Sequence, residues 1–314
     1  MRAIVTGGAG FIGSNIVDAL IERGDEVTVI DDLSTGKREN LDLALSRGAR
    51  LSVLDIRDAE QLSGVIDEFA PQTIFHLAAQ IDVRRSLTDP ATDAAINVLG
   101  TINLLEAARE HAVGRIVYSS TGGAIYGDAE TIPTAEHTTP APEAAYGQSK
   151  LAAEGYLALY ERLYGQRSVT LRYGNVYGPR QDPLGEAGVV AIFAGLLETG
   201  GEPTIFGDGR QTRDYVYVGD VVAANLAALE CDSPGPFNIG TAVETSVLEL
   251  VALLRECSGA ERFEPRFAPA RLGELARSCL DIGRAREELG WAPTVSIREG
   301  LRLTLDAGPA VSAR

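Results

Sequence analysis

The strongest chemical signal in the chain is a tyrosine and a lysine four residues apart, in the stretch AAYGQSKLAAEGYLALYERL. On a helix, Tyr146 and Lys150 lie on the same face, about one turn apart. An ammonium group beside a phenol favours the phenolate, so the pair is a candidate general base for a sugar or alcohol hydroxyl. A long helix can also contain this spacing by chance, and its meaning depends on what the rest of the chain binds.

A second signal is the stretch TGGAGFIGS, which lies between the strand-like AIV and the helix-like FIGSNIVDALIERG. Both G-x-G-x-x-G and G-x-x-G-x-x-G fit it. Glycines here allow a tight turn, a close approach of backbone to a pyrophosphate and close helix-to-strand packing, while the helix start offers free N–H groups. The stretch predicts a dinucleotide site, with contacts from Gly7, Gly10, Phe11, Ile12 and Gly13.

The next predicted strand ends in VIDD and places Asp31 eighteen residues after Gly13. A carboxylate at this position accepts hydrogen bonds from both adenosine ribose hydroxyls and repels a 2′-phosphate. We therefore expect NAD rather than NADP. Lys37 and Arg38 follow soon after, and we interpret them as a solvated helix start. A positive nicotinamide ring near Tyr146 would help to lower the tyrosine pKa from its usual value of about 10.

Composition limits the other functions that the chain can have. The formal charge of −16 disfavours nucleic acid and anionic membranes as partners, and no apolar run approaches a membrane span. Cys231, Cys257 and Cys279 lack a C-x-x-C spacing and fit reduced thiols in the cytoplasm. The three histidines share no spacing typical of metal ligands, so we expect no metal site.

Strand-like runs alternate with amphipathic segments through the first half of the chain: RAIVT, EVTVID, RLSVLD, TIFHLA and RIVYSS. This alternation predicts an α/β fold of the Rossmann type, a doubly wound parallel sheet with helices on both faces. Shorter pieces and Pro- and Gly-containing loops follow. We expect an NAD-binding domain over 1–174 and a smaller, interleaved substrate-binding lobe over 175–314, of which about 214–240 returns to the sheet.

Several motifs in register carry a family resemblance: TGGAGFIGS, DDLSTG, FHLAAQ, YSSTGGAIYG, YGQSK, LRYGNVYGPRQDPLGEAGVVAIF, GDGRQTRDYVYVGD and RLGELARSCLD. Together they resemble the extended short-chain dehydrogenase/reductase superfamily over nearly the whole chain. Their order is similar to that of nucleotide-sugar 4-epimerases, especially the bacterial UDP-glucose 4-epimerase group.

The resemblance implies a catalytic triad of Thr121, Tyr146 and Lys150. It implies further contacts to NAD from residues at strand ends and on neighbouring helices: Asp55, Ile56, Ala78, Ala79, Asn97, Ser119, Tyr146, Lys150 and Tyr173. For the nucleotide diphosphate and sugar it implies Thr121, Tyr146, Asn175, Val190, Ile205, Arg213 and Arg271, with the backbone of PTIF passing the uracil. Each strand-end residue also has a purely structural interpretation.

The activity implied is an NAD-dependent interconversion of UDP-glucose and UDP-galactose through a 4-keto intermediate. UDP-glucuronate is an alternative substrate, with Arg180 or Arg84 facing its carboxylate. Dehydratases and decarboxylases of the superfamily need an acid after the active-site threonine, where this chain has Gly122, Gly123 and Ala124. A non-catalytic NAD-binding regulatory protein is a further alternative. The resemblance also implies a homodimer, formed through helices at Ala91–His111 and Ala145–Tyr164.

Overall fold

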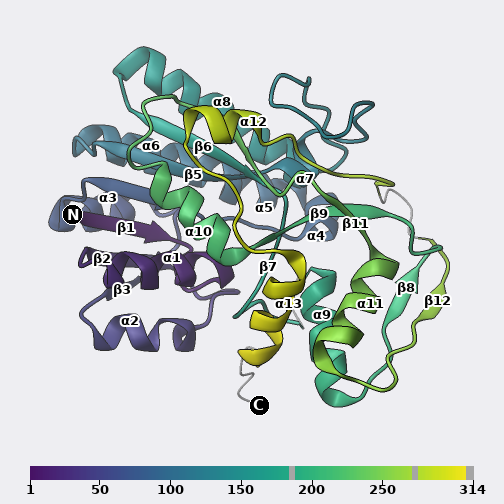
Figure 1. The fold of residues 1–314 in the computed structure, drawn as a ribbon. Coiled ribbons are helices and arrows are strands. Elements are labelled where there is room, and N and C mark those ends of the chain that lie inside the picture. The colour runs from purple at the N-terminus through teal and green to yellow at the C-terminus, as the bar shows by residue number, and fades with distance from the viewer. Residues whose placement is uncertain (184–187, 271–274, 309–314) are drawn as a thin grey trace.

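A computed structural model describes residues 1–183, 188–270 and 275–308. Its centre is a seven-stranded sheet in the order β10-β6-β5-β4-β1-β2-β3, in which every neighbouring pair is parallel. The strands are β1 (Arg2–Thr6), β2 (Glu26–Asp31), β3 (Arg50–Val53), β4 (Thr73–His76), β5 (Arg115–Thr121), β6 (Ser168–Tyr173) and β10 (Phe237–Ile239). The predicted doubly wound fold is confirmed (Figure 1).

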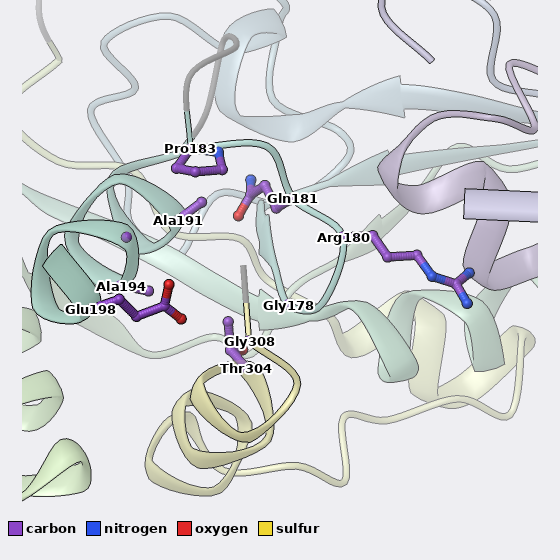
Figure 2. A pocket seen from close by; sticks show the side chains of 10 residues that line it. Gly178, Arg180, Gln181, Pro183, Ala191, Ala194, Glu198, Thr304 and Gly308 are labelled. Atoms are coloured by element: carbon purple, nitrogen blue, oxygen red, sulfur yellow. The ribbon is translucent and has the colours of Figure 1, made fainter. Parts of the chain in front are cut away.

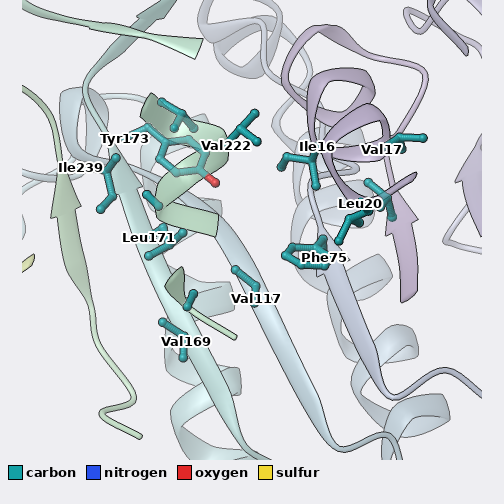
Figure 3. Packing of buried hydrophobic residues seen from close by; sticks show 14 of the residues in the cluster. Ile16, Val17, Leu20, Phe75, Val117, Val169, Leu171, Tyr173, Val222 and Ile239 are labelled. Atoms are coloured by element: carbon teal, nitrogen blue, oxygen red, sulfur yellow. The ribbon is translucent and has the colours of Figure 1, made fainter. Parts of the chain in front are cut away.

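Helices cover both faces of this sheet. One face carries α1 (Phe11–Glu22), α2 (Asp42–Ser46), α10 (Val218–Ala227) and α12 (Gly283–Glu288); the other carries α3 (Ala59–Phe69), α6 (Gly100–Glu110) and α8 (Ala145–Tyr164). Successive residues of each strand point to opposite faces, so Val5 packs toward α1 while Ile4 packs toward α3 and α6. Figure 3 shows the first of these cores, with Ile16 and Leu20 of α1 beside Phe75.

Short elements fill the carboxyl edge of the sheet. They are the 3₁₀ turn η1 (Arg38–Leu41), α4 (Val83–Thr88), α5 (Pro90–Ala94), the π-helical turn η2 (Ala95–Leu99) and α7 (Gly122–Ile125). The sequence predicts a single helix from Ala91 to His111. The structure instead places a π-turn at 95–99 between α5 and α6, so the side chains on either side are rotated relative to a regular helix.

The second lobe has its own small sheets and core. β11 (Glu244–Ser246), β9 (Thr212–Tyr217) and β7 (Asn175–Tyr177) form one sheet, and β12 (Arg266–Ala268) pairs with β8 (Thr204–Phe206) in another. The helices are α9 (Val189–Thr199), α11 (Val247–Ser258) and α13 (Ile297–Asp306). Ser246 and Glu249 form a reciprocal capping box at the start of α11.

The two parts of the chain are interleaved. After β9, α10 packs against α1 and β10 extends the large sheet beside β6, and α12 then packs against β10. The division into 1–174 and 175–314 remains our prediction about domains. Within the described residues, no helix is both long and apolar enough to cross a bilayer.

Candidate active site

The candidate residues collect at the carboxyl edge of the parallel sheet, around the point where strand order reverses between β1 and β4. Connections leave this point in opposite directions and open a crevice, which is where doubly wound sheets bind ligands. Gly7 follows β1, Asp31 ends β2, Ala78 follows β4 and Thr121 ends β5. The fold therefore brings to one edge of the sheet residues as far apart in the sequence as Gly7 and Thr121.

The glycine loop has no room for side chains. Gly7 has a left-handed φ of +68°, and a Cβ added there would lie 2.7 Å from the backbone nitrogen of Ala78. A Cβ on Gly13 would lie 2.2 Å from the carbonyl oxygen of Gly7. α1 begins at Phe11 without a side-chain cap or an acidic residue in its first turn, so its N–H groups remain available for an anion. This cradle fits the pyrophosphate of NAD.

Asp31 is nearly buried and accepts two backbone hydrogen bonds, from Ala9 N–H to Oδ2 and from Leu33 N–H to Oδ1, both at 2.9 Å. These bonds fix the carboxylate against the glycine loop. Burial still raises its pKa, because the backbone donors offset only part of the desolvation. A carboxylate has about four lone-pair sites, so it retains acceptors for the ribose hydroxyls that we expect it to bind.

The other predicted NAD contacts line the same edge. Asp55 is held by an ion pair with Arg57, which lowers the pKa of its carboxyl group, and Ile56 packs against the Cα of Gly100. Ala78 N–H donates to Thr6 Oγ1 at 3.2 Å, and the partly exposed Ala79 comes next. These placements fit the expected roles, which remain predictions.

Ser119 and Tyr173 come from neighbouring strands and contact each other. The Ser119 hydroxyl lies 2.9 Å from the Tyr173 hydroxyl, which also accepts from Asn225 Nδ2 at 2.8 Å. Both side chains are nearly buried, on the sheet face that carries α10. Any contact that Tyr173 makes with NAD would come from its ring, since its hydroxyl is already satisfied.

Tyr146 lies in the first turn of α8, and the structure explains how it is placed. The helix has no cap from its own N-cap residue, Ala144; instead the buried Ser86 hydroxyl of α4 accepts from Tyr146 N–H at 3.0 Å. The phenol forms a hydrogen bond with the hydroxyl of Thr121, which lowers its pKa. The two predicted catalytic hydroxyls are therefore adjacent.

Desolvation, with a smaller contribution from Asp93, raises the pKa of Tyr146 to about 12. The described residues by themselves thus favour the neutral phenol. The lowering that proton abstraction needs remains a prediction, which rests on Lys150 and on the positive nicotinamide ring.

Lys150 lies one turn further along α8 and is almost completely buried, at 3% exposure. Its Nζ lies 4.6 Å from the centre of the Tyr118 ring, a cation–π contact that partly replaces lost hydration. Burial lowers its pKa to about 8, although Glu154 and Asp93 act to raise it. The lysine is therefore mostly charged at neutral pH.

Two acidic residues near the catalytic pair, the buried Asp93 and the partly buried Glu154, escaped the sequence analysis. Asp93 accepts hydrogen bonds from Gln80 Nε2 at 2.9 Å and Asn97 Nδ2 at 3.2 Å. Asn97 Nδ2 also lies 3.0 Å from Ser149 Oγ. The predicted NAD contact Asn97 is thus tied to α5 and α8.

Glu154, one turn after Lys150, accepts from Ser120 Oγ at 2.6 Å and from Arg172 Nη2 at 2.6 Å. Arg172 Nη1 in turn donates to the Tyr126 hydroxyl at 2.8 Å. No motif marks either acid, because both depend on partners from other elements. Their nearest signal is the i, i+4 spacing of Asp93 with Asn97 and of Lys150 with Glu154.

The substrate candidates lie on the second lobe. Asn175 begins β7, close to Gly123, whereas Val190 and Ile205 have side chains buried in the lobe's core, so they can offer only backbone to a ligand. Arg213 Nη1 donates to the carbonyl oxygens of Thr212 and Leu275, at 2.8 and 2.9 Å. Arg271 lies outside the described residues.

Beside these residues, a groove of about 450 Å³ lies between the chain that joins β8 to β9 and the chain that follows β12, with Phe206, Gln211 and Arg277 among its lining residues. Its size is typical of a small-molecule site. PTIF, including β8, borders this groove, as we expect for a nucleotide base.

The loop that joins the lobes is tied to the NAD-binding half. Arg180 pairs with Asp18 of α1, and Lys37 Nζ lies 2.7 Å from Asp182. The adjoining cavity, of about 20 Å³, is lined by Gln181 and Glu198 and has room for only a water molecule. Figure 2 shows Arg180 extending away from this cavity. Neither Arg180 nor Lys37 is therefore a free cation.

The fold and the site together define a class, the NAD-binding enzymes that carry a tyrosine–lysine pair at the carboxyl edge of a doubly wound sheet. The chain belongs to the NAD dependent epimerase/dehydratase family, whose model matches residues 3–240.

Similar proteins match nearly the whole chain. A UDP-glucose 4-epimerase of Mycolicibacterium smegmatis is 49% identical over 98% of both chains. The crystal structure of a UDP-glucose 4-epimerase from Thermotoga maritima with UDP-glucose matches with a TM-score of 0.94 at 48% identity, and that of a Thermus thermophilus UDP-glucose 4-epimerase in complex with NAD with 0.91 at 46%. Each structure covers 98% of this chain and 98% of its own.

Proposed function

We propose that the protein is an isomerase, an NAD-dependent UDP-glucose 4-epimerase that interconverts UDP-glucose and UDP-galactose. The observation that carries the proposal is the juxtaposition of Thr121, Tyr146 and Lys150 at the end of β5, beside a glycine cradle that fits NAD. The full-length similarity to UDP-glucose 4-epimerases supports the same activity.

The chain's own residues account for the proton chemistry. Tyr146 removes the proton of the sugar 4-hydroxyl, and Thr121 holds the same oxygen by a hydrogen bond. Lys150 stabilises the phenolate that this requires. NAD held in the glycine cradle would supply a reversible hydride acceptor for C4, so that the sugar passes through a 4-keto form.

Inversion requires the 4-keto sugar to present its other face. The second lobe clamps the nucleotide through Arg213 and Arg271, while the sugar itself is weakly held and can rotate about its phosphate linkage. Arginine suits the clamp because its planar fork binds phosphate oxygens in pairs. Since hydride is returned to the sugar that gave it, no external oxidant is consumed.

Two features distinguish this proposal from elimination chemistry and from uronate substrates. The two residues after Thr121 are Gly122 and Gly123, so the chain has no acid there to expel water, and a Cβ on Gly122 would have to displace Leu280, whose Cδ1 would lie 2.6 Å away. Arg180, one of the two arginines considered for a uronate carboxylate, is already paired with Asp18. Both observations favour a neutral hexose and simple epimerisation.

The test is to incubate the purified protein with UDP-glucose, UDP-galactose and UDP-glucuronate without added oxidant and to identify the products by NMR. We expect UDP-glucose and UDP-galactose to interconvert. Loss of water or carbon dioxide would instead identify a dehydratase or a decarboxylase. An absence of turnover in protein that retains NAD would favour a non-catalytic role.

We also infer a homodimer and a cytoplasmic location. The helices expected to form the dimer expose large apolar side chains, Leu99 on η2 and Tyr156, Leu163 and Tyr164 on α8. The free cysteines Cys231, Cys257 and Cys279 fit a reducing compartment.

A further inference from the structure

Asp93 is a buried carboxylate whose hydrogen-bond partners are neutral. It lies on α5, is 1% exposed, and accepts from the side-chain amides of Gln80 and Asn97. Burying a charge costs several kcal/mol unless an opposite charge compensates it. Within the described part of the chain no arginine forms an ion pair with Asp93, so its compensating charge must come from elsewhere.

Glu154 differs from Asp93 in having a positively charged partner. It is also near Lys150, but the Arg172 guanidinium donates to both of its oxygens, at 3.0 and 2.6 Å. Its charge is therefore already matched. Among the two acids that flank Lys150, Asp93 is the one whose charge remains for the lysine.

The elements packed around Lys150 support this assignment. α5 packs against α8, and Asn97 links them, since its Nδ2 contacts both Asp93 and Ser149, the residue before Lys150. The titratable groups that interact with this centre are Tyr146 and Glu154 of α8, Tyr118 of β5 and His76 of β4. His76 is neutral, because burial lowers its pKa to about 3. Asp93 is thus the unmatched negative charge of this centre.

We propose that Asp93 is a positioning residue for the reaction: its fixed negative charge holds the proton on Lys150, and its bonds to Gln80 and Asn97 fix α5 against the catalytic helix. The inference rests on the proposed function, because the reaction needs Lys150 as a cation beside Tyr146. No motif or spacing in the sequence assigns such a role to Asp93.

The sign of the effect follows from Coulomb's law. A negative neighbour raises the pKa of both an ammonium group and a phenol, and it acts in this way on Lys150 and on Tyr146. Removing the charge lowers both values. In Asp93→Asn, Tyr146 ionises and Lys150 loses its proton at lower pH. The acidic and the alkaline limbs of the plot of kcat/KM against pH therefore both shift to lower pH, by about one unit. If the role of Asp93 were purely structural, kcat/KM would be lower at every pH, but the two limbs would stay at the same pH values.

Composition makes a direct measurement possible, because the chain has only two lysines, Lys37 and Lys150. Holoenzyme labelled with [ε-¹³C]lysine should give two side-chain signals, and Lys37→Arg assigns them by removing one. The Lys150 signal is titrated in the unchanged protein and in Asp93→Asn, with Asp93→Ser as a second neutral variant. Asp93→Glu keeps the charge. Asp89→Asn is the matched control, since it makes the same chemical change at the exposed N-cap of α5.

We expect the pKa of Lys150 to fall by about one unit in the neutral variants and to stay near its original value in Asp93→Glu and Asp89→Asn. An unchanged Lys150 pKa in a folded neutral variant overturns the proposal, and so does failure of both neutral variants to fold. The NMR titration uses no sugar substrate. A shifted pKa in a protein without epimerase activity would therefore reject the proposed function and leave the electrostatic role of Asp93 intact.

Discussion

At the scale of single residues, the proposed reaction depends on one proton that must leave the sugar 4-hydroxyl. Tyr146→Phe keeps the ring but removes the oxygen that contacts Thr121. Loss of a general base costs about 10²- to 10⁴-fold in rate, and we expect kcat for UDP-glucose to fall by that factor. UDP-sugar affinity, measured by calorimetry, should change little, because the lost contact matters chiefly in the transition state.

Arg213→Ala should have the opposite effect to Tyr146→Phe on binding and turnover. This arginine lies on β9, in the second lobe, so its removal should weaken UDP-sugar binding more than it lowers kcat. Nearly full epimerase activity in Tyr146→Phe would show that another group takes the proton, whatever the arginine variant does.

His76 should make the free energy of unfolding decrease at acidic pH. Its ring nitrogens contact Thr6 Oγ1 at 2.7 Å and Thr101 Oγ1 at 3.0 Å, and burial lowers its pKa to about 3. The unfolded chain takes up this proton near pH 6.5, so it binds more protons than the native state at every pH between about 6.5 and 3. Stability should therefore fall as the pH drops through this window.

The measurement is urea unfolding at pH 7.5 and pH 5 for the unchanged protein, His76→Asn and the exposed-site control His137→Asn. We expect the unchanged protein and the control to lose about 2 kcal/mol more than His76→Asn over this interval. Equal losses in all three would mean that His76 takes up its proton without unfolding the protein.

Residue-level prediction from sequence worked where covalent spacing fixes geometry. Tyr146 and Lys150 share a helix face because they are four residues apart, and Gly7 and Gly13 must be glycine because backbone atoms occupy the space of a side chain. It missed Asp93, whose partner Gln80 lies on another segment, because such contacts exist only after folding. The pKa of Tyr146 depends on the same long-range contacts, and spacing alone does not give it.

At the scale of elements, the turn from β1 to α1 is the part of the fold that we expect to hold the pyrophosphate of NAD. A Cβ on Gly13 would lie 2.2 Å from Gly7 O and 2.8 Å from Gly8 Cα, so Gly13→Ala must push the helix away from the loop. We expect the NAD content of the purified protein to fall from near one per chain to a small fraction. Gly64→Ala is the control, because Gly64 lies within α3 with nothing near its missing side chain.

The control should retain NAD and gain up to about 1 kcal/mol of stability, since alanine favours a helix over glycine. Both variants are measured by enzymatic assay of NAD in the denatured supernatant and by urea unfolding. If Gly13→Ala carries as much NAD as the unchanged protein, the pyrophosphate does not depend on the close approach seen at this turn.

The helices and strands were predicted from hydrophobic periodicity. The prediction was wrong where a change of structure leaves that periodicity unchanged. The strands β1 and β2 lie where the β-branched runs RAIVT and EVTVID predict them. The π-turn over Ala95–Leu99 was missed, because a single extra residue in a helical turn leaves the apolar pattern of the segment almost unchanged. This turn begins two residues after Asp93 and contains Asn97, and the side chains of Asp93 and Asn97 form a hydrogen bond beside the catalytic helix.

At the scale of the whole molecule, the chain crosses between its two parts several times. β7 and β9 pair in the second lobe, yet the segments after each of them differ: α9 stays in the lobe, while α10 and β10 return to the large sheet. Arg180 and Asp182, on the loop after β7, pair with Asp18 and Lys37 of the other half. The sequence predicts the return of the chain near 214–240 from its strand-and-helix pattern, but it does not predict these ion pairs.

We expect a homodimer to bury the exposed apolar side chains of two helices. Leu99 is 51% exposed on η2, and Leu163 and Tyr164 are 60% and 54% exposed on α8, so the two expected interface helices display apolar side chains to solvent. Exposed large apolar side chains on neighbouring helices are candidates for burial in a protein contact, and a two-fold dimer buries the same residues on both chains. We expect light scattering to give a mass of twice the 33.3 kDa chain.

Leu99→Glu places a charge in the expected contact and should give the 33.3 kDa monomer at micromolar concentration. Leu43→Glu is the matched control, because Leu43 is 46% exposed on α2, away from both helices, and this variant should remain dimeric. The glycine cradle and the predicted catalytic residues Thr121, Tyr146 and Lys150 lie together within one chain, so we expect the monomer also to keep its bound NAD. A monomeric unchanged protein, or a Leu99→Glu variant that stays dimeric, would place the contact elsewhere or remove it.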